Sequence, residues 1–136
     1  MTKVYAGNVE FENIEDYVAA MEAWERHRAP FKVQAETLAG EFIDHLQEQG
    51  LSKRTISKHD QNIEIFIVYL TQYTDADDFA TVRKGVVNTE FFRWYRRKVL
   101  NRMDQASLQS TTKKFFKFLA ERKDIYNEKV LGKRKE

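Results

Sequence analysis

The chain has 136 residues, a formal net charge of +2 and no cysteine. A length of this order favours one domain with a core of its own. The lack of cysteine excludes disulfides and thiolate metal sites, and it favours an intracellular, cytoplasmic protein. No stretch approaches the roughly 20 apolar residues of a membrane helix, and the first residues lack the apolar run of a signal peptide.

Charge is divided unevenly along the chain. Residues 1–50 contain 4 Lys/Arg and 10 Asp/Glu, a balance of −6, whereas residues 51–136 contain 19 and 11, a balance of +8. An acidic first third and a basic remainder indicate that only the later part faces nucleic acid. The charge by itself is equally typical of lysine-rich helices that are simply solvated.

The first third predicts two helices separated by a proline. Residues 1–12 lack helical periodicity, which indicates a short extended piece or a disordered lead-in. A first helix is expected over residues 13–28, because Asn13 is a good N-cap, and Pro30 is expected to end it. A second helix follows over residues 32–49. The apolar stripe of the first helix is Ile14, Tyr17, Val18, Met21 and Trp24.

The junction at Gly50 and Ser52 predicts the start of a third helix. Gly50 suits the left-handed residue that closes a helix, and the hydroxyl of Ser52 can accept from a backbone N–H of the next first turn. Cations at a helix N-terminus oppose the helix dipole, so Lys53 and Arg54 indicate a role toward a partner. Apolar residues recur at steps of three, four and seven, which marks one helical face; they are Ile56, Ile63, Phe66, Ile67 and Leu70.

The later part predicts two more helices. Residues 74–88 are expected to form a linker with one helical turn. A fourth helix begins near Thr89, and a fifth covers residues 105–122 or 107–122. Their aromatic residues lie at helical spacing and are assigned to the core rather than to base stacking: Phe91, Trp94, Phe115 and Phe118. The cations interleaved in the fourth helix are Arg93, Arg96, Arg97, Lys98 and Arg102. The tail over residues 126–136 is expected to be a frayed helix or a linker.

No group of residues has the spacing of a catalytic or metal site. The three histidines have no metal-ligand spacing; they are His27, His45 and His59. The acidic cluster at residues 75–78 lacks the glycine and the closing bidentate glutamate of a calcium loop. There is no glycine-rich phosphate loop and no nucleophile elbow. The chain is therefore expected not to be an enzyme, and to need neither cofactor nor metal.

Two of the predicted helices carry basic and hydroxyl side chains on an exposed stripe. Lysine and arginine give salt-dependent affinity for phosphates, and serine and threonine add hydrogen bonds to phosphates or base edges. A helix fits the major groove of DNA. The stripe of the third helix is Ser52, Lys53, Arg54, Thr55 and Lys58, and that of the fifth is Ser110, Thr111, Lys113, Lys114 and Lys117.

Several short sequence segments, taken in their order along the chain, follow the pattern of a known family. The first segments are Phe42-Ile43-Asp44-His45-Leu46-Gln47-Glu48-Gln49-Gly50, Leu51-Ser52-Lys53-Arg54-Thr55-Ile56 and Asn62-Ile63-Glu64-Ile65-Phe66 with Tyr69-Leu70. The later segments are Val87-Asn88-Thr89-Glu90-Phe91-Phe92, Ser110-Thr111-Thr112-Lys113 and Phe115-Phe116-Lys117-Phe118-Leu119. Over residues 35–125 the chain resembles the N-terminal core-binding (SAM-like) domain of the tyrosine recombinases, the phage integrase family.

The resemblance implies an all-α fold, a compact orthogonal bundle of four core helices, here with an extra N-terminal helix. In that family the domain is half of a clamp around double-stranded DNA, and its second and fourth helices approach the major groove. Counted from the helix before Gly50, these match the two basic helices. Carried over by position, the DNA contacts are Lys53, Arg54, Thr55 and Lys58 on one helix and Ser110, Thr111, Lys113, Lys114 and Lys117 on the other. The implied division is 1–30 as an N-terminal extension with an acidic helix, 31–125 as the SAM-like domain and 126–136 as a basic tail or linker.

The family's catalytic half supplies an Arg, a His-x-x-Arg and a nucleophilic Tyr, and this sequence lacks that pattern. The expected function is therefore non-catalytic binding of double-stranded DNA in recombination and integration. A catalytic recombinase domain or a second copy of the chain would be a further partner. Whether the chain is a fragment of a longer integrase or a stand-alone relative stays open. The alternative is a protein-interaction or regulatory domain that kept the fold and lost DNA binding, which the acidic first helix favours.

Overall fold

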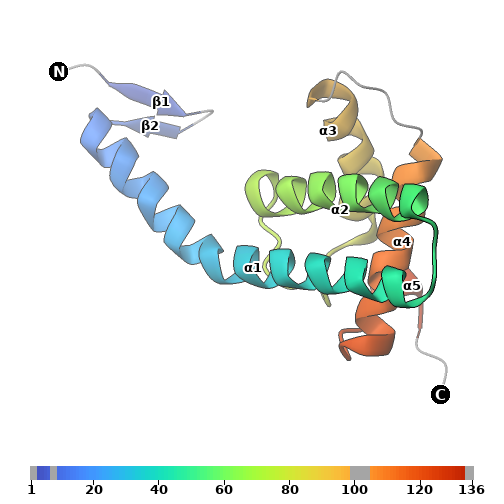
Figure 1. Cartoon of the computed structure of the whole chain (residues 1–136). Helices are drawn as coiled ribbons and strands as arrows, with labels where there is room; N and C mark the ends of the chain where they lie inside the picture. The colour runs from blue at the N-terminus through green and yellow to red at the C-terminus, as the bar shows by residue number, and fades with distance from the viewer. Residues whose placement is uncertain (1–2, 7–8, 99–104, 134–136) are drawn as a thin grey trace.

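The longest element is α1 (Ile14–Glu48), a single helix that runs through Pro30. The computed structural model describes residues 3–6, 9–98 and 105–133 (Figure 1). The prediction of two helices separated at Pro30 is therefore wrong. A proline inside a helix removes one backbone hydrogen bond at a cost of about 3 kcal/mol. Tertiary contacts on both sides of Pro30 offset that loss.

Arg28 makes these contacts on the N-terminal side of the proline. Its side chain is buried, at 5% exposure. Nη2 donates to the Leu70 carbonyl at 2.9 Å, and Nη1 donates to the Ala76 carbonyl. The guanidinium also lies 5.3 Å from the ring centroid of Phe31, which is buried on the other side of Pro30. These contacts hold α1 to the end of the neighbouring helix on both sides of Pro30, the residue at which the missing backbone hydrogen bond would otherwise end it.

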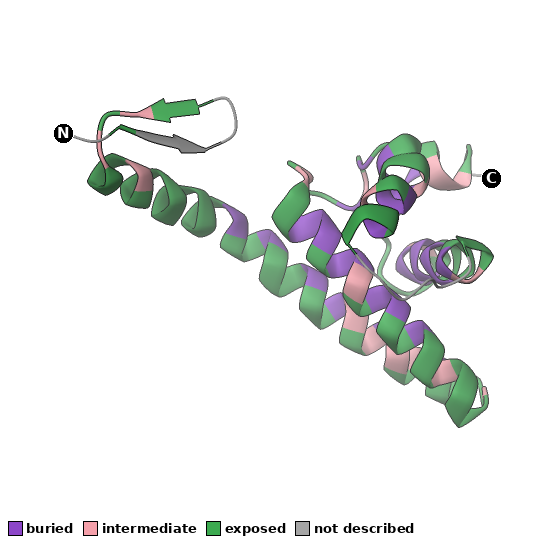
Figure 2. Cartoon of the chain, turned by 90° about the horizontal axis from the view of Figure 1, so that it is seen from above, coloured by how far each residue is buried: buried purple, intermediate pink, exposed green. Residues whose placement is uncertain are grey.

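One apolar stripe follows α1 at steps of three and four, but only its second half is covered. The covered residues are Phe31, Ala35, Leu38, Phe42 and Leu46. They pack against α2 (Lys53–Tyr73), which lies alongside this half of α1 (Figure 2). Toward the N-terminus the stripe continues as exposed side chains: Ile14 at 64%, Val18 at 44%, Met21 at 38% and Trp24 at 40% exposure. These residues belong to the apolar stripe expected for the first helix, and the structure leaves them exposed.

Before α1, two short strands form a hairpin. β1 (Val4–Ala6) pairs antiparallel with β2 (Val9–Phe11), with Val4 opposite Phe11. The ring of Phe11 contacts Tyr17 edge-on, with centroids 5.5 Å apart, and so joins the hairpin to α1. Of the two expectations for residues 1–12, the extended piece is the one found. We call the hairpin and residues 14–27 of α1 the arm, which extends away from the bundle in Figure 1.

The core lies where the second half of α1 and α2 meet the later helices. After α2 come η1 (Val86–Glu90), α3 (Phe91–Lys98), α4 (Gln105–Arg122) and α5 (Glu128–Leu131). α4 crosses α2 at a steep angle (Figure 1). The centre is a set of phenylalanines of at most 1% exposure, namely Phe42, Phe66, Phe79, Phe91, Phe115 and Phe116. The all-α bundle of four core helices is confirmed, with the extra N-terminal helix continuous with the first of them.

Helix ends that depend on local chemistry agree with the sequence. Gly50 has a φ of 75° after α1. The side chains of Asn13 and Ser52 cap α1 and α2 by accepting from Asp16 N and Thr55 N. α4 has the longer of the two expected ranges. The aromatic assignment also holds, since Phe91, Phe115 and Phe118 are buried and Trp94 is partly buried against the core.

Two later segments differ from expectation. The helical run toward α3 begins at Lys84 rather than near Thr89, and it passes through the π-helix η1 at Val86–Glu90. Residues 126–131 are not frayed, because Asn127 is buried and its Nδ2 donates to the carbonyls of Phe79 at 2.7 Å and Val82 at 2.8 Å. Val130 and Leu131 also pack on the core. Arg102 of the expected fourth helix and residues 134–136 of the expected tail fall outside the described residues.

Within the described ranges, no helix combines the length and apolar content that crossing a bilayer requires.

Candidate nucleic-acid interface

A buried polar contact fixes α2 against α4. His59 Nδ1 lies 2.7 Å from Thr111 Oγ1. Asn62 Nδ2 donates to Thr111 Oγ1 at 3.0 Å and to Ser107 Oγ at 3.1 Å. Asn62 is 1% exposed and Thr111 is fully buried. Because buried polar groups need partners, these hydrogen bonds specify how the two helices are placed relative to each other.

The structure places eight of the nine DNA-contact candidates on the surface. The exposed ones are Lys53, Arg54, Thr55, Lys58, Ser110, Lys113, Lys114 and Lys117. Thr111 differs, because its hydroxyl is bonded to His59 and Asn62 between the helices. Thr55 is exposed, but its Oγ1 accepts from Ser52 Oγ at 2.9 Å within the helix cap. Thr111 therefore lies at the edge of the α4 stripe that faces α2, not at its solvent-facing centre.

The two basic stripes meet beside His59. Burial, followed by the nearby positive charges of Lys114 on α4 and Lys58 on α2, holds the pKa of the His59 imidazole below its ordinary value of 6.5. A cation from each helix is therefore close to the same ring. Arg54 lies one helical turn before Lys58, on the same side of α2. We call Arg54, Lys58, Ser110, Lys114 and Lys117 the basic wall.

Lys53 and Lys113 lie toward the margins of this surface. Lys53 is five residues before Lys58, which places it well around α2 and toward α1. Lys113 precedes Lys114 by one residue and so lies farther around α4 from α2. The structure brings Lys58 and Lys114 together and leaves these two lysines at the flanks.

The wall carries cations without carboxylate partners among the described residues. The ion pairs found there join Lys3 to Glu10 and Lys123 to Glu41, and neither pair includes a residue of the wall. In the same ranges, no three His, Cys, Asp or Glu side chains gather as metal ligands would. A surface of exposed cations on two fixed helices is suited to a polyanion.

A pH effect on stability is expected from His59. Its neighbours are Lys58 on its own helix, Lys114 on α4 and the ring of Phe42 on α1, whose centroid is 6.5 Å away. The native pKa is lowered, so the unfolded chain binds this proton more readily. The free energy of unfolding should therefore fall as pH drops from 6.5 through the native pKa, and be constant from this source above 6.5. Urea unfolding at pH 7.5 and 5.5 measures it.

The matched comparison for this pH effect uses His59→Gln and, in the arm, His27→Gln. The His59→Gln variant should lose less free energy of unfolding between the two pH values than the parent does. The His27→Gln variant should behave like the parent. An equal loss in parent and His59→Gln proteins would contradict the expectation.

A second basic cluster was not among the sequence-based site candidates. Arg93, Arg96 and Arg97 of α3 line a cavity of about 430 Å³ that faces the start of α4. Its other lining residues are Asn88, Thr89, Phe92, Gln105 and Gln109. The signal was present, since the arginines recur at steps of three and four, but they were interpreted only as cations interleaved with core aromatics.

Comparison with protein families gives one match. The family model described as "Phage integrase, N-terminal SAM-like domain" matches residues 39–123, more than half of the chain. The matched segment begins in the second half of α1, contains α2, α3 and α4, and excludes the arm. No curated protein and no solved structure matched the chain. The match agrees with the resemblance drawn from the sequence, and the chain belongs to the phage integrase N-terminal SAM-like domain family.

Proposed function

We propose that the chain binds double-stranded DNA as the core-binding module of an integrase or recombinase, without catalysing a reaction by itself. The observation that carries the proposal is the buried contact of His59 and Asn62 on α2 with Thr111 on α4, which fixes the two helices that carry the exposed cations. Two helices from distant parts of the chain thereby present one cationic surface. Their relative placement is fixed by buried hydrogen bonds, so the surface is preformed rather than assembled on binding.

The contacts divide by chemistry. Arg54, Lys58, Lys114 and Lys117 would hold backbone phosphates, which supplies affinity without sequence information. Ser110 lies between the cations on the exposed side of α4 and would add a hydrogen bond to a phosphate or a base edge. Lys53 and Lys113 would contact phosphates at the margins. Thr111 has a positioning role, because its hydroxyl is used by the contact between the helices.

Tyr69, one of six tyrosines in the chain, is buried and is not placed to act as a nucleophile. Its hydroxyl donates to the Val86 carbonyl at 2.8 Å. Burial and the negative charge of Glu90 raise the pKa of Tyr69 to about 12. A phenol held protonated and bonded to the backbone is a poor nucleophile, so Tyr69 is a packing residue.

Salt dependence of duplex binding tests the proposal. With about five phosphate contacts, the logarithm of affinity should fall against the logarithm of salt concentration with a slope near −4 to −5. Fluorescence anisotropy of a labelled duplex of 20–30 base pairs, titrated with protein at several salt concentrations (about 50 to 200 mM), measures the slope. Absence of binding at the lowest salt would remove the proposal.

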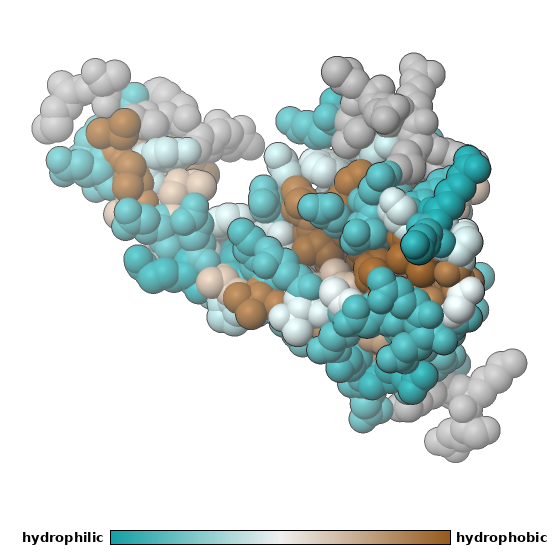
Figure 3. All heavy atoms as spheres, in the orientation of Figure 1, coloured by the Kyte–Doolittle hydropathy of each residue, from teal (hydrophilic) through white to brown (hydrophobic). Residues whose placement is uncertain are grey.

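The arm favours a second candidate, a protein-interaction or regulatory domain. A groove of about 880 Å³ separates the arm from the end of α2, lined by Met21, Trp24 and Tyr73 among others. Figure 3 shows hydrophobic surface on the arm, away from the bundle. Glu15, Asp16, Glu22 and Glu25 flank it, so the partner would be a helix with an apolar face and Lys or Arg beside it. Failure to retard long duplex DNA at low salt and micromolar protein would favour this candidate.

A further inference from the structure

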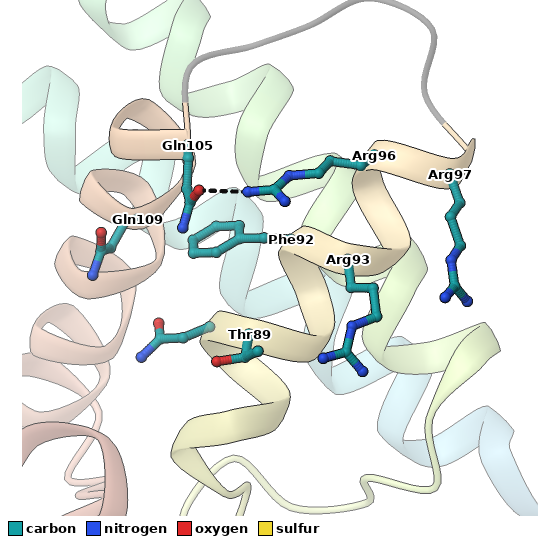
Figure 4. A pocket seen from close by; sticks show the side chains of 8 residues that line it. Thr89, Phe92, Arg93, Arg96, Arg97, Gln105 and Gln109 are labelled. Atoms are coloured by element: carbon teal, nitrogen blue, oxygen red, sulfur yellow. Dashed lines mark hydrogen bonds between the residues drawn. The ribbon is translucent and has the colours of Figure 1, made fainter.

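The cavity between α3 and α4 has the lining of an anion site. Figure 4 shows Arg96 extending toward Gln105, with the ring of Phe92 between the two helices and Arg93 on the same side of α3 as Thr89. Arg96 Nη2 donates to Gln105 Oε1 at 2.9 Å. Phe92 is 6% exposed and closes the base of the cavity. Side chains of two helices therefore surround a space of about 430 Å³ with N–H and O–H donors.

Among the described residues that line the cavity, the charges are all of one sign. Its three ionisable residues are arginines, and none of them takes part in an ion pair found among the described residues. Arg93 and Arg97 also border a neighbouring cavity that contains Asp75 and Glu90. Arg96 does not line that second cavity.

The donors fit a phosphate group. Guanidinium presents a planar fork that matches phosphate oxygens two at a time, and amide and hydroxyl groups bond the remaining oxygens. Gln105 is the first residue of α4, an 18-residue helix, and the positive end of a helix dipole also favours an anion.

The cavity is connected to the basic wall along α4. Gln105, Gln109, Lys113 and Lys117 follow one another at four-residue steps on the exposed side of this helix. Lys113, at the margin of the wall, lies eight residues after Gln105, which is about 12 Å along the helix and roughly one major-groove width. A duplex held by the wall would therefore bring a backbone phosphate within reach of Arg96.

We propose that the α3–α4 cavity binds a phosphate group, supplied by the backbone of the same duplex that the basic wall holds. The inference rests on the proposed function and adds a third helix to the interface. It assigns Arg96 as the main phosphate ligand, with Gln105 holding its guanidinium and Arg93 as a second cation. One further phosphate contact is then made outside the two helices with which the resemblance is concerned.

Duplex binding by Arg96→Gln tests the inference. Loss of one phosphate contact should lower the affinity about tenfold near 0.1 M salt and make the salt slope shallower by about 0.9. Arg96→Lys keeps the charge and loses the fork, so it should keep the slope and lose part of the affinity. Arg26→Gln, an exposed arginine of the arm, removes the same charge and should change neither quantity. Thermal unfolding of each variant checks that the fold is intact.

A second measurement separates the two sources of phosphate. Inorganic phosphate is titrated into the protein while the side-chain amide signals of Gln105 and Gln109 are followed by NMR. Shifts in the parent that vanish in Arg96→Gln support the site. If these shifts occur but Arg96→Gln binds duplex like the parent, the site takes free phosphate and the duplex assignment is overturned.

The outcomes also separate this inference from the proposed function. If alanine substitutions in the wall abolish duplex binding while Arg96→Gln leaves it unchanged and phosphate shifts neither glutamine, the inference fails and the function stands. If the parent binds no duplex at low salt, the function fails and the duplex assignment falls with it. The NMR titration then still decides whether the cavity binds phosphate.

Discussion

Alanine at Arg54, Lys58, Lys114 and Lys117 together should lower the affinity for duplex DNA roughly ten-thousandfold near 0.1 M salt. Each phosphate contact contributes about 0.9 to the salt slope and about a factor of ten at this concentration. Losing four contacts should therefore leave a slope close to −1. All four side chains are exposed, so the fold should persist. Anisotropy titrations across salt concentrations, with circular dichroism as a check on helix content, measure both effects.

The matched control removes the same charge elsewhere. Arg26, Lys32, Arg83 and Lys84 are exposed and belong to the arm, α1 and the segment before η1. Their replacement by alanine should change the affinity by only a few-fold, through the weaker long-range field. If both quadruple variants lose affinity equally, binding follows net charge and the wall has no special role.

Phe115→Ala should give the largest loss of stability, about 3–5 kcal/mol. The ring is fully buried. Its centroid lies 5.4 Å from that of Phe42, 5.5 Å from that of Phe79 and 6.0 Å from that of Phe116. It therefore joins α1, the segment after α2 and α4. A small domain is stable by only about 5–15 kcal/mol, so urea unfolding should shift to much lower denaturant.

The control for this prediction is Val33→Ala, whose side chain is 64% exposed on α1. It should change the free energy of unfolding by less than about 0.5 kcal/mol. A loss below about 1.5 kcal/mol for Phe115→Ala would mean that the phenylalanine cluster is loosely packed.

Features decided within a few residues were predictable from the sequence. The caps at Asn13 and Ser52 and the left-handed Gly50 depend on atoms three or four positions away. Pro30 is the opposite case, because the contacts that keep α1 helical come from the Leu70 and Ala76 carbonyls. The docking of the last segment likewise depends on carbonyls 45 to 48 residues before Asn127.

In the candidate site, too, features set by residues near in sequence were predictable, and features set by distant residues were not. Periodicity identified the exposed faces of α2 and α4, yet it does not say which edge of a stripe meets the neighbouring helix. Thr111 was therefore grouped with the surface residues, although it bonds to His59 and Asn62 between the helices. Arg96 was missed for a related reason. Its partner Gln105 is on another helix, and only the fold brings the two together.

The continuity of α1 has a consequence for how the molecule opens. Pro30 interrupts its hydrogen-bond ladder, and beyond Arg28 the side chains toward the N-terminus are exposed or half-buried. Amide hydrogens of residues 14–26 should therefore exchange with solvent through local openings, whereas those of residues 34–46 should exchange only when the whole bundle unfolds. One uninterrupted helix would then contain two cooperative units, with the guanidinium of Arg28 at their boundary.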